Sequence, residues 1–334
     1  MTMPRASHTA TTLPDGRVLI AGGCTTDGCG GTPEGGRSEF YDPATGRFTA
    51  GPNMIQARGG HTATRLPDGR VLYAGGYPDE GRPPLRSLEM FDPTTNEFTE
   101  VAQMASGRGW HSATLLRDGR VLLVGGVDAR QALSTVEVFD PLTSRLVRAA
   151  SMPQPRATHV AGLLDNGRVL VAGGQTLPGH GRGIVGTALL FDPATNAWSG
   201  VGDLQVARYK AAMAPLKDGA LVIGGQTADD AAARLPSTER FDPATNGFTA
   251  GPTMSEPRYK ISDAVVVLRD GRVVVAGGFG VDVLYGNEVR PIGPPGSVER
   301  QFPAAAELLD GTVLVTGGYS ERTEVTASAV LVRP

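Results

Sequence analysis

Two neighbouring Tyr-Lys pairs are the residues of this sequence best suited to chemistry. They occur in the segments Arg208-Tyr209-Lys210 and Arg258-Tyr259-Lys260. A lysine ammonium group stabilises a nearby phenolate, which lowers the pKa of the tyrosine and allows it to act as an acid or a base. The arginine in front of each pair can hold a carboxylate or a phosphate through paired hydrogen bonds. We therefore predict a pocket that binds an anion and transfers protons.

Histidine stands three residues after an arginine in four earlier segments of the chain. These histidines are His8, His61, His111 and His159. In three later segments the equivalent position is found by counting back from the Asp-Gly pair that follows, and it is occupied by Ala211, Asp263 and Pro303. Four equivalent positions favour a structural role, in which imidazole bridges polar groups, because a metal would need ligands that converge within bonding distance. We therefore predict no metal and no cofactor.

One unit recurs along the chain and must position these residues. It contains Arg-x-x-His-Thr-Ala-Thr, Asp-Gly-Arg and Val-Leu-x-x-Gly-Gly, and after a variable loop it continues with Phe-Asp-Pro-x-Thr-Asn, an aromatic residue and Met or Leu. The Gly-Gly pair marks seven units, at Gly22-Gly23, Gly75-Gly76, Gly125-Gly126, Gly173-Gly174, Gly224-Gly225, Gly277-Gly278 and Gly317-Gly318. A repeat of about 50 residues indicates that the whole chain forms one body.

Each unit is predicted to contain four short strands. In the second unit the first strand spans His61–Leu66 and the second spans Val71–Ala74, and Asp68-Gly69 between them is a strong hairpin signal. A third strand ends before the turn at 92–96, in which Pro fixes φ and Asn tolerates the left-handed conformation. A fourth strand ends near Met104.

The Gly-Gly pair and two columns of aromatic residues complete the pattern. The aromatic residues are Tyr41, Phe91, Phe139, Phe191 and Phe241 on third strands, and Phe48, Phe98, Trp198 and Phe248 on fourth strands. This pattern resembles the kelch repeat over the whole chain. The resemblance implies an all-β fold: a single-domain, seven-bladed kelch β-propeller with four-stranded antiparallel blades. The predicted blades span residues 5–54, 55–104, 105–152, 153–204, 205–254, 255–299 and 300–334.

The last two units depart from this pattern. In unit six the third strand is predicted at Val281–Tyr285, no Asp-Pro turn follows it, and only Phe279–Gly280 links it to the Gly-Gly pair. In unit seven Val332-Arg333-Pro334 replaces Phe-Asp-Pro, and no fourth strand follows. We therefore predict that blade seven has three strands, or that its closing strand is missing from this sequence. An open strand edge there would be an association hazard.

The site is predicted on the face that carries the variable loops between second and third strands, because rigid scaffolds commonly present function on such loops. First strands begin there beside the central channel, and Glu307 lies on one of them, where a carboxylate needs a partner. Trp110 would supply a stacking wall. The predicted catalytic residues are Tyr209, Lys210, Tyr259, Lys260 and Glu307, and the predicted substrate-binding residues are Arg208, Arg258, Arg300, Asp263, Trp110 and His111. The alternative is that Tyr and Lys only fill and solubilise the rim.

Composition excludes several classes of protein. The formal net charge is −3 and no basic stripe is present, which argues against nucleic-acid binding. No apolar run is long enough to cross a bilayer, so no membrane partner is expected. The N-terminus lacks the apolar segment of a signal peptide, which favours the cytoplasm, and we expect the chain to be a monomer. Cys24 and Cys29 are interpreted as a local loop clip or two free thiols rather than as a metal site.

Kelch propellers serve as oxidases, epimerases and binding scaffolds, so the resemblance alone does not give a function. Galactose-oxidase-type copper chemistry is disfavoured, because both cysteines lie in the first variable loop and the rim tyrosines precede Lys rather than His. We predict a small-molecule-binding propeller, with acid–base catalysis on an anionic substrate (isomerase, epimerase, lyase or cyclase type) as its enzymatic form. The alternative is a non-catalytic scaffold that binds a protein or peptide at the propeller mouth. A deep pocket would favour the enzyme, and a flat, filled rim would favour the scaffold.

Overall fold

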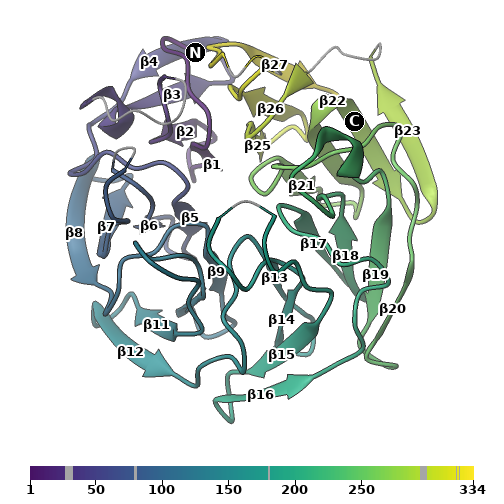
Figure 1. Cartoon of the computed structure of the whole chain (residues 1–334). Coiled ribbons are helices and arrows are strands. Elements are labelled where there is room, and N and C mark those ends of the chain that lie inside the picture. The colour runs from purple at the N-terminus through teal and green to yellow at the C-terminus, as the bar shows by residue number, and fades with distance from the viewer. Residues whose placement is uncertain (27–32, 79–80, 180, 294–298, 321, 323) are drawn as a thin grey trace.

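The computed structural model describes residues 1–26, 33–78, 81–179, 181–293, 299–320, 322 and 324–334. Its strands form seven antiparallel sheets that surround a central channel as the blades of a propeller (Figure 1). The prediction of an all-β, seven-bladed propeller is therefore confirmed.

The first strand of each blade lies next to the channel, and the others follow outwards. The first strands are β1 (Thr9–Thr12), β5 (Thr62–Arg65), β9 (Ser112–Leu115), β13 (Val160–Leu163), β17 (Ala212–Leu216), β21 (Val265–Val267) and β25 (Ala304–Glu307). The second strands are β2 (Val18–Ala21), β6 (Val71–Ala74), β10 (Val121–Val124), β14 (Val169–Ala172), β18 (Gly219–Ile223) and β26 (Val313–Thr316).

The outer strands complete each blade. The third strands are β3 (Ser38–Asp42), β7 (Ser87–Asp92), β11 (Val136–Asp140), β15 (Ala188–Asp192), β19 (Thr238–Asp242) and β27 (Ala329–Val332). The fourth strands are β4 (Arg47–Ala50), β8 (Glu97–Gln103), β12 (Arg145–Ala149), β16 (Ala197–Gly200), β20 (Gly247–Ala250) and β23 (Glu288–Ile292). The remaining elements are the strands β22 (Val273–Tyr285) and β24 (Glu299–Arg300) and two short 3-10 helices, η2 (Pro33–Gly36) and η3 (Ala231–Ala233).

The core lies between neighbouring blades. Every residue of the second strands is buried, as in β2 and β6, because successive side chains point to opposite faces and each face packs on another blade. One such cluster joins Leu19 and Phe40 of blade one to Tyr73 and Phe91 of blade two. The apolar runs of the second strands therefore reflect burial on both faces.

The Gly-Gly pairs allow adjacent blades to approach closely. The N–H of Gly76 donates to the carbonyl of Arg108 in the next blade at 2.9 Å. Gly75 has φ +59°, and a Cβ there would lie 2.2 Å from the same carbonyl oxygen. Only glycine fits both the left-handed backbone and this contact. The contact recurs around the ring, and Gly318 closes it by donating to the carbonyl of Arg5.

The repeated arginines are structural clamps. Arg58 is buried, and its guanidinium donates to the Gly75 carbonyl at 2.8 Å and to the carboxylate of Glu89 on β7. Glu89 also accepts the N–H groups of Ile55 and Gln56, which lead into the blade. The same ion pair occurs in Arg5–Glu39, Arg108–Glu137, Arg208–Glu239 and Arg258–Asp282. These pairs fasten the strand connections to the blades.

Blades six and seven depart from the pattern as predicted. In blade six β22 covers the positions of both the second and the third strand, and both of its halves pack in one core cluster. Blade seven has three strands, in the order β25-β26-β27. The ammonium group of Met1 donates to the carbonyl of Ala327 at 2.8 Å, so the N-terminal segment lies beside blade seven (Figure 1).

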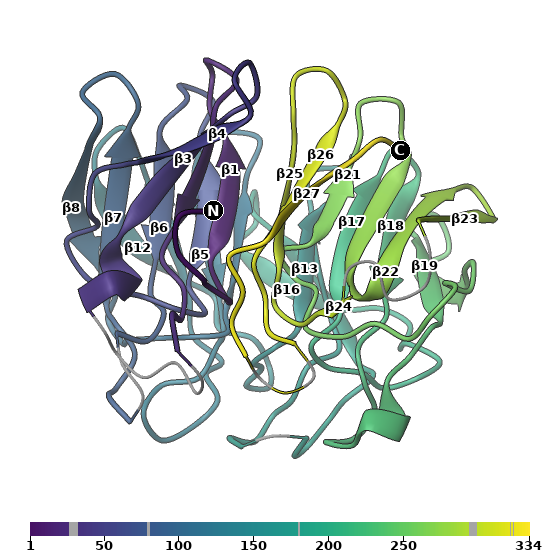
Figure 2. The same cartoon turned by 90° about the horizontal axis from the view of Figure 1, so that it is seen from above.

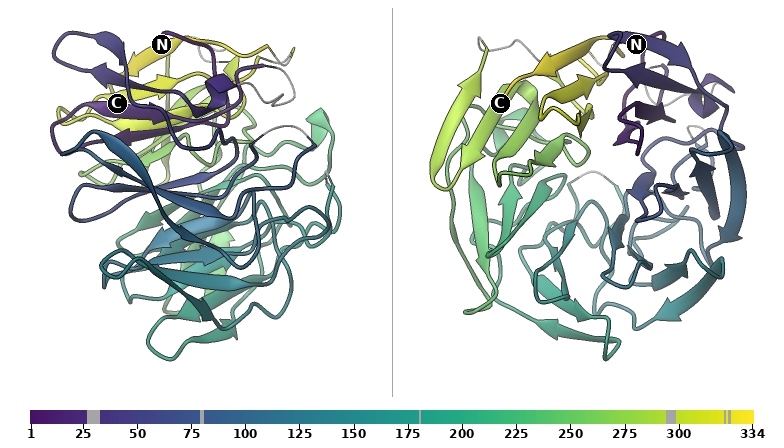
Figure 3. Two further views of the ribbon diagram at one scale, coloured as in Figure 1. Left: turned by 90° about the vertical axis from the view of Figure 1, so that its left-hand side faces the viewer. Right: turned by 180° about the vertical axis from the view of Figure 1, so that it is seen from behind.

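The two faces of the ring differ. The short turns between strands gather on one face, and the longer loops with η2 and η3 gather on the other (Figure 2), while the view from behind shows the seven sheets around the channel (Figure 3). Cys24 is disulfide-bonded, and Cys29 lies outside the described residues. Within the described part of the chain, no helix is long and apolar enough to cross a membrane.

Candidate functional site

A ring of seven residues, one from each blade, surrounds the loop-side mouth of the channel. We call it the channel ring, and it consists of Ser7, Gly60, Trp110, Thr158, Lys210, Lys260 and Phe302. All seven have left-handed backbones, with φ between 51° for Ser7 and 60° for Gly60. This conformation is uncommon for residues with a Cβ, and most of all for a β-branched threonine. Its recurrence in every blade shows that the architecture requires it.

A closed circle of backbone hydrogen bonds holds the channel ring. The N–H of Trp110 donates to the carbonyl of Gly60 at 3.3 Å, and the N–H of Thr158 donates to the carbonyl of Trp110 at 3.0 Å. The circle continues through the two lysines and ends where Ser7 donates to Phe302 at 3.1 Å. Each residue is thus fixed through its backbone, which leaves its side chain to line the channel. The backbone sets the geometry of this circle, and the side chains alone set its chemistry.

The channel ring stands between two connected spaces. An outer space of about 250 Å³ includes Tyr77, Val127 and Gln175 from the loop side. An inner space of about 100 Å³ is lined by the whole channel ring and, among others, by His61, His111, His159 and Asp263. Trp110, Thr158, the two lysines and Phe302 line both spaces. The rim is therefore hollow rather than flat and filled.

One half of the channel ring is aromatic. The rings of Trp110 and Phe302 pack with centroids 5.2 Å apart and planes inclined by 31°. They meet although Ser7 and Gly60 separate them in the circle, because these two positions carry the smallest side chains of the ring. Trp110, which was predicted to supply a stacking wall, lines the cavity together with Phe302, which was not predicted.

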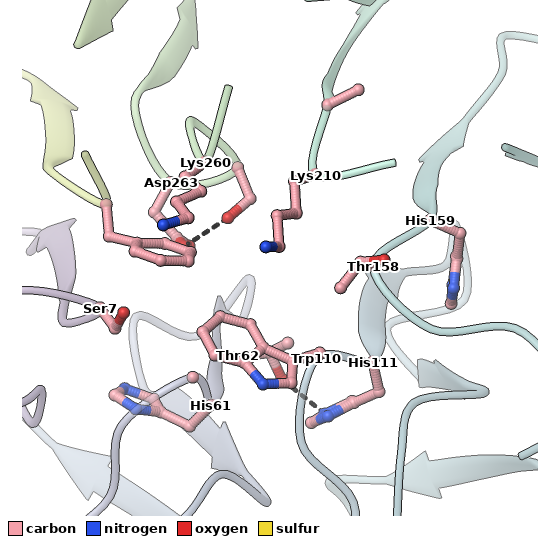
Figure 4. Close-up of a pocket in the computed structure, with 14 residues that line it drawn as sticks. Ser7, His61, Thr62, Trp110, His111, Thr158, His159, Lys210, Lys260 and Asp263 are labelled. Carbon is pink, nitrogen blue, oxygen red and sulfur yellow. Dashed lines mark hydrogen bonds between the residues drawn. The ribbon is translucent and has the colours of Figure 1, made fainter. Parts of the chain in front are cut away.

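The other half of the channel ring is cationic. Lys210 and Lys260 are adjacent in the circle, and their side chains point into the channel (Figure 4). Burial and, to a smaller extent, the positive charge of Lys260 together lower the pKa of Lys210 to about 8, although the negative charge of Asp229 opposes this shift. The Lys260 ammonium donates to Oε1 of Gln301 at 2.9 Å and lies between the rings of Tyr259 and Phe302. Lys260 is therefore firmly positioned.

A two-residue insertion places a carboxyl group in the inner space. The circle identifies Lys260 as the counterpart of Trp110, so Ile261 and not Asp263 stands at the histidine position. This corrects the prediction made by counting back from Asp-Gly, because Ser262 and Asp263 form a turn that lengthens blade six. Asp263 lines the cavity, where desolvation by the surrounding protein raises the pKa of its carboxyl to about 6, and the hydrogen bond from Ser262 opposes this shift.

The four histidines join neighbouring blades, as predicted for a structural role. Nε2 of His61 bonds the hydroxyl of Thr9 at 3.2 Å, and Nε2 of His111 bonds that of Thr62 at 3.1 Å. Burial lowers the pKa of His61 to about 3 and holds that of His111 well below its usual value, so both are neutral. Within the described residues, no cluster of three or more His, Cys, Asp or Glu side chains could hold a metal ion.

The two tyrosines lie behind the channel ring rather than in it. Tyr209 is fully buried, accepts a hydrogen bond from Gln226 and donates to Asp229 at 3.3 Å. Burial raises its pKa, which contradicts the expectation that Lys210 lowers it. Tyr259 donates to the same Gln301 oxygen that holds Lys260, at 2.7 Å. Neither tyrosine is among the residues that line the cavity, and the ammonium groups of Lys210 and Lys260 lie over the rings of Tyr209 and Tyr259, respectively.

The predicted arginine anchors and Glu307 also lie outside the cavity. Arg208 and Arg258 are clamps, and their guanidiniums bond Glu239 and Asp282 within the blades. Arg300 donates to the hydroxyl of Ser328 at 2.6 Å. Glu307 ends β25, where its carbonyl accepts from Thr12, and it is not among the residues that line the cavity. The structure therefore brings together only Lys210, Lys260, Asp263, Trp110 and His111 of the predicted set.

Several lining residues were missed by the sequence analysis. They include Ser7, Gly60, Thr158, Ser262 and Phe302. A signal for four of them was present, because they stand two residues after the repeated arginine, in the same column as Trp110, Lys210 and Lys260. Ser262 is part of the insertion, which has no counterpart in the other units.

Comparison with known proteins concerns the repeats. The model of the KLHDC2/KLHL20/DRC7 Kelch-repeats domain matches residues 60–278, which include most of the blades described above. No curated protein matches the chain.

Proposed function

Because the chain belongs to this Kelch-repeats domain family, we propose on that premise that its central channel is a binding site for a small organic anion. The observation that carries the proposal is the pair of adjacent lysines, Lys210 and Lys260, in the cavity wall. They occupy equivalent positions of neighbouring blades, so their ammonium groups face one space.

The use of lysine at these positions is selective. The chain has only three lysines, Lys210, Lys217 and Lys260, and arginine supplies its other basic residues. Two of the three lysines line the cavity. Lysine differs from arginine in that burial can move its pKa towards neutrality. Two like charges brought together in a partly buried space repel each other, and a bound anion would offset that repulsion.

The remaining walls indicate the shape of the anion. Trp110 and Phe302 offer an apolar surface beside the lysines, and Thr158 adds a hydroxyl group. Pockets of this kind orient a ligand by a few polar groups on a largely apolar wall. We therefore expect a carboxylate or phosphate that is attached to a flat or apolar body.

Acid–base catalysis is a second candidate, and one observation favours it. Lys210 has a pKa of about 8 and Asp263 one of about 6, and both line the same cavity. Groups that titrate on either side of neutral pH suit proton transfer. This would correspond to an isomerase, epimerase, lyase or cyclase, with Lys210 and Asp263 in place of the tyrosines first considered.

Calorimetric titration tests the binding proposal. Benzoate and phenyl phosphate are the anionic probes, and benzyl alcohol is the neutral analogue. We expect the anions to bind and the alcohol not to, and we expect Lys210→Met and Lys260→Met each to weaken anion binding about tenfold or more, since hydrogen bonds to charged groups contribute roughly 1.5–3 kcal/mol. Lys217→Met is the matched control, because Lys217 is exposed and outside the cavity.

Two results would contradict the proposal. Equal binding of benzyl alcohol and benzoate would show that charge is not recognised. Anion binding that survives both cavity substitutions but is lost in Lys217→Met would move the site to the surface. In either case the peptide-binding scaffold would become the better interpretation of the loop face.

A further inference from the structure

The inner space of the channel carries a negative group that the anion site does not use. Asp263 lines the inner space but not the outer one, which places it beyond the lysines as seen from the loop side. Its Oδ2 accepts a hydrogen bond from the Ser262 hydroxyl at 2.9 Å. No ion pair joins Asp263 to a basic side chain within the described residues. A carboxylate that lines the cavity in this way can accept a hydrogen bond from a donor group of a ligand.

Neutral groups make up the rest of the inner wall. His61, His111 and His159 hydrogen-bond to hydroxyl groups of neighbouring blades and remain uncharged, because burial keeps their pKa values far below neutrality. Ala211 takes the histidine position in blade five. The cavity is therefore bipolar: it is positive at the channel ring and negative at Asp263.

The two-residue insertion in blade six places the negatively charged carboxylate of Asp263 in the cavity wall. The N–H of Ala305 in blade seven donates to the carbonyl of Asp263 at 2.7 Å, and the N–H of Ala264 donates to Ile261 at 3.0 Å, so the turn is held from both sides. Asp263 is thereby fixed within a wall shared by two blades. Figure 4 shows Asp263 and Lys260 on the same side of the cavity, with Lys210 beside them and Trp110 across from them.

We propose that the ligand of this channel is itself bipolar, with a carboxylate or phosphate held by Lys210 and Lys260 and an amine held by the Asp263 carboxylate in the inner space. This inference rests on the proposed anion site and names the class of molecule that the site selects. The inner space of about 100 Å³ is larger than the roughly 10–15 Å³ that one water molecule requires, so it admits a small group such as an aminomethyl. The rest of the ligand lies against Trp110.

Three probes that differ only in one substituent test the proposal. They are benzoate, meta-(aminomethyl)benzoate and benzene-meta-dicarboxylate, and their affinities are measured by calorimetric titration at about pH 7.5. We expect meta-(aminomethyl)benzoate to bind about tenfold or more tightly than benzoate, because a hydrogen bond between an ammonium group and a carboxylate is stronger than one between neutral groups. The dicarboxylate should bind more weakly than benzoate, because its second charge is repelled by Asp263.

The variant Asp263→Asn removes the negative charge of the inner space and tests its role separately from that of the lysines. The expected result is loss of the preference for the amine, so that the variant binds meta-(aminomethyl)benzoate at most about twofold more tightly than benzoate. Asp203→Asn, at an exposed position outside the cavity, is the matched control and should keep the preference. Melting temperatures of both variants show whether the fold is intact.

A pH titration of the wild-type protein gives an independent measurement. The groups that face Asp263 are the two lysines and the three neutral histidines, and Asp263 is the one among them with a pKa of about 6. The preference for the amine should therefore fall as the pH is lowered from about 7.5 to about 5. Binding of benzoate with no preference for the amine, in the wild type and at both pH values, would overturn this inference and leave the anion site standing. Absence of anion binding altogether would instead overturn the proposed function.

Discussion

The indole of Trp110 lies over Gly60, and a Cβ at Gly60 would come within 3.1 Å of its ring. Gly60 precedes Trp110 in the circle of backbone hydrogen bonds. The missing side chain is what allows Trp110 to lean across the circle and pack on Phe302. The aromatic half of the cavity wall thus depends on a residue that itself contributes no side chain.

Gly60→Ala should therefore displace Trp110. The substitution should also destabilise the fold by about 1–2 kcal/mol, because the alanine must adopt the left-handed backbone conformation of Gly60. Gly46→Ala is the control, because Gly46 has φ +66° and nothing near its Cβ position. We expect both variants to lose stability, and only Gly60→Ala to change the fluorescence of Trp110 in a Trp198→Phe background. Identical spectra for the two variants would contradict the packing described here.

The lowered pKa of Lys210 makes stability depend on pH in a defined window. The folded protein releases this proton at about pH 8, whereas the unfolded chain keeps it up to the ordinary value of 10.5. Between these values the unfolded state binds more protons, so the free energy of unfolding rises with pH. Lys210→Met should therefore be more stable than wild type below pH 8, and its advantage should shrink towards pH 10.5.

Melting temperatures of both proteins at about pH 7 and about pH 10 measure this difference. Lys217→Met controls for the loss of a lysine at an exposed position. A difference between Lys210→Met and wild type that is the same at both pH values would show that Lys210 is not buried enough to matter.

Glu89 should be among the residues whose charge matters most for stability. Its carboxylate and the Arg58 guanidinium are both fully buried. Glu89→Gln leaves a buried arginine without its counter-charge, and we expect a loss of about 3 kcal/mol in chemical denaturation. Asp68→Asn breaks the exposed pair with Arg70 and should cost less than about 1 kcal/mol. Similar losses in the two variants would rule out a structural clamp.

The outer edge of β27 should accept a fourth strand. The hydrogen bond from Met1 to the Ala327 carbonyl has a counterpart at the end of a complete blade, where the N–H of Met254 donates to the Pro236 carbonyl at 2.9 Å. Val330 and Leu331 are 38% and 49% exposed on this edge. A copy of residues 245–253 fused ahead of Met1 should therefore pair with β27 and raise the melting temperature.

A proline-containing copy provides the control for this fusion, because proline removes the N–H groups that pair with the edge. The control fusion should melt like the unextended chain. If both fusions raise the melting temperature equally, strand pairing is not the cause.

Much of the fold follows from local patterns. The seven Gly-Gly pairs, the Asp-Gly turns and the apolar second strands recur in register, and each has a local physical reason. The irregularity of the last two blades could also be predicted, because unit six lacks a long loop after Gly278 and unit seven ends at Val332-Arg333-Pro334. Because the units repeat, a strand assignment that is correct for one unit also applies to the others.

The residues of the candidate site could be predicted only in part from such local patterns. Tyr209 and Lys210 are adjacent in the chain, yet one is buried behind the wall and the other lines the cavity. The left-handed backbone at Lys210 decides this, and the hydrogen bonds that hold it come from Thr158 and Lys260 in the neighbouring blades. No single unit contains that information.

The amino-acid sequence by itself determined the number of blades, the irregular sector and the candidate lysines, because these depend on patterns within a unit. Only the tertiary structure decided which side chains meet. It shows that Arg208 and Arg258 form buried ion pairs instead of lining the cavity. It also shows that an insertion places Asp263 in the cavity wall, and that Trp110 packs on Phe302 across the circle. The clamps join residues of one blade that lie far apart in the sequence, and the contact between Trp110 and Phe302 forms only when the ring brings two different blades together.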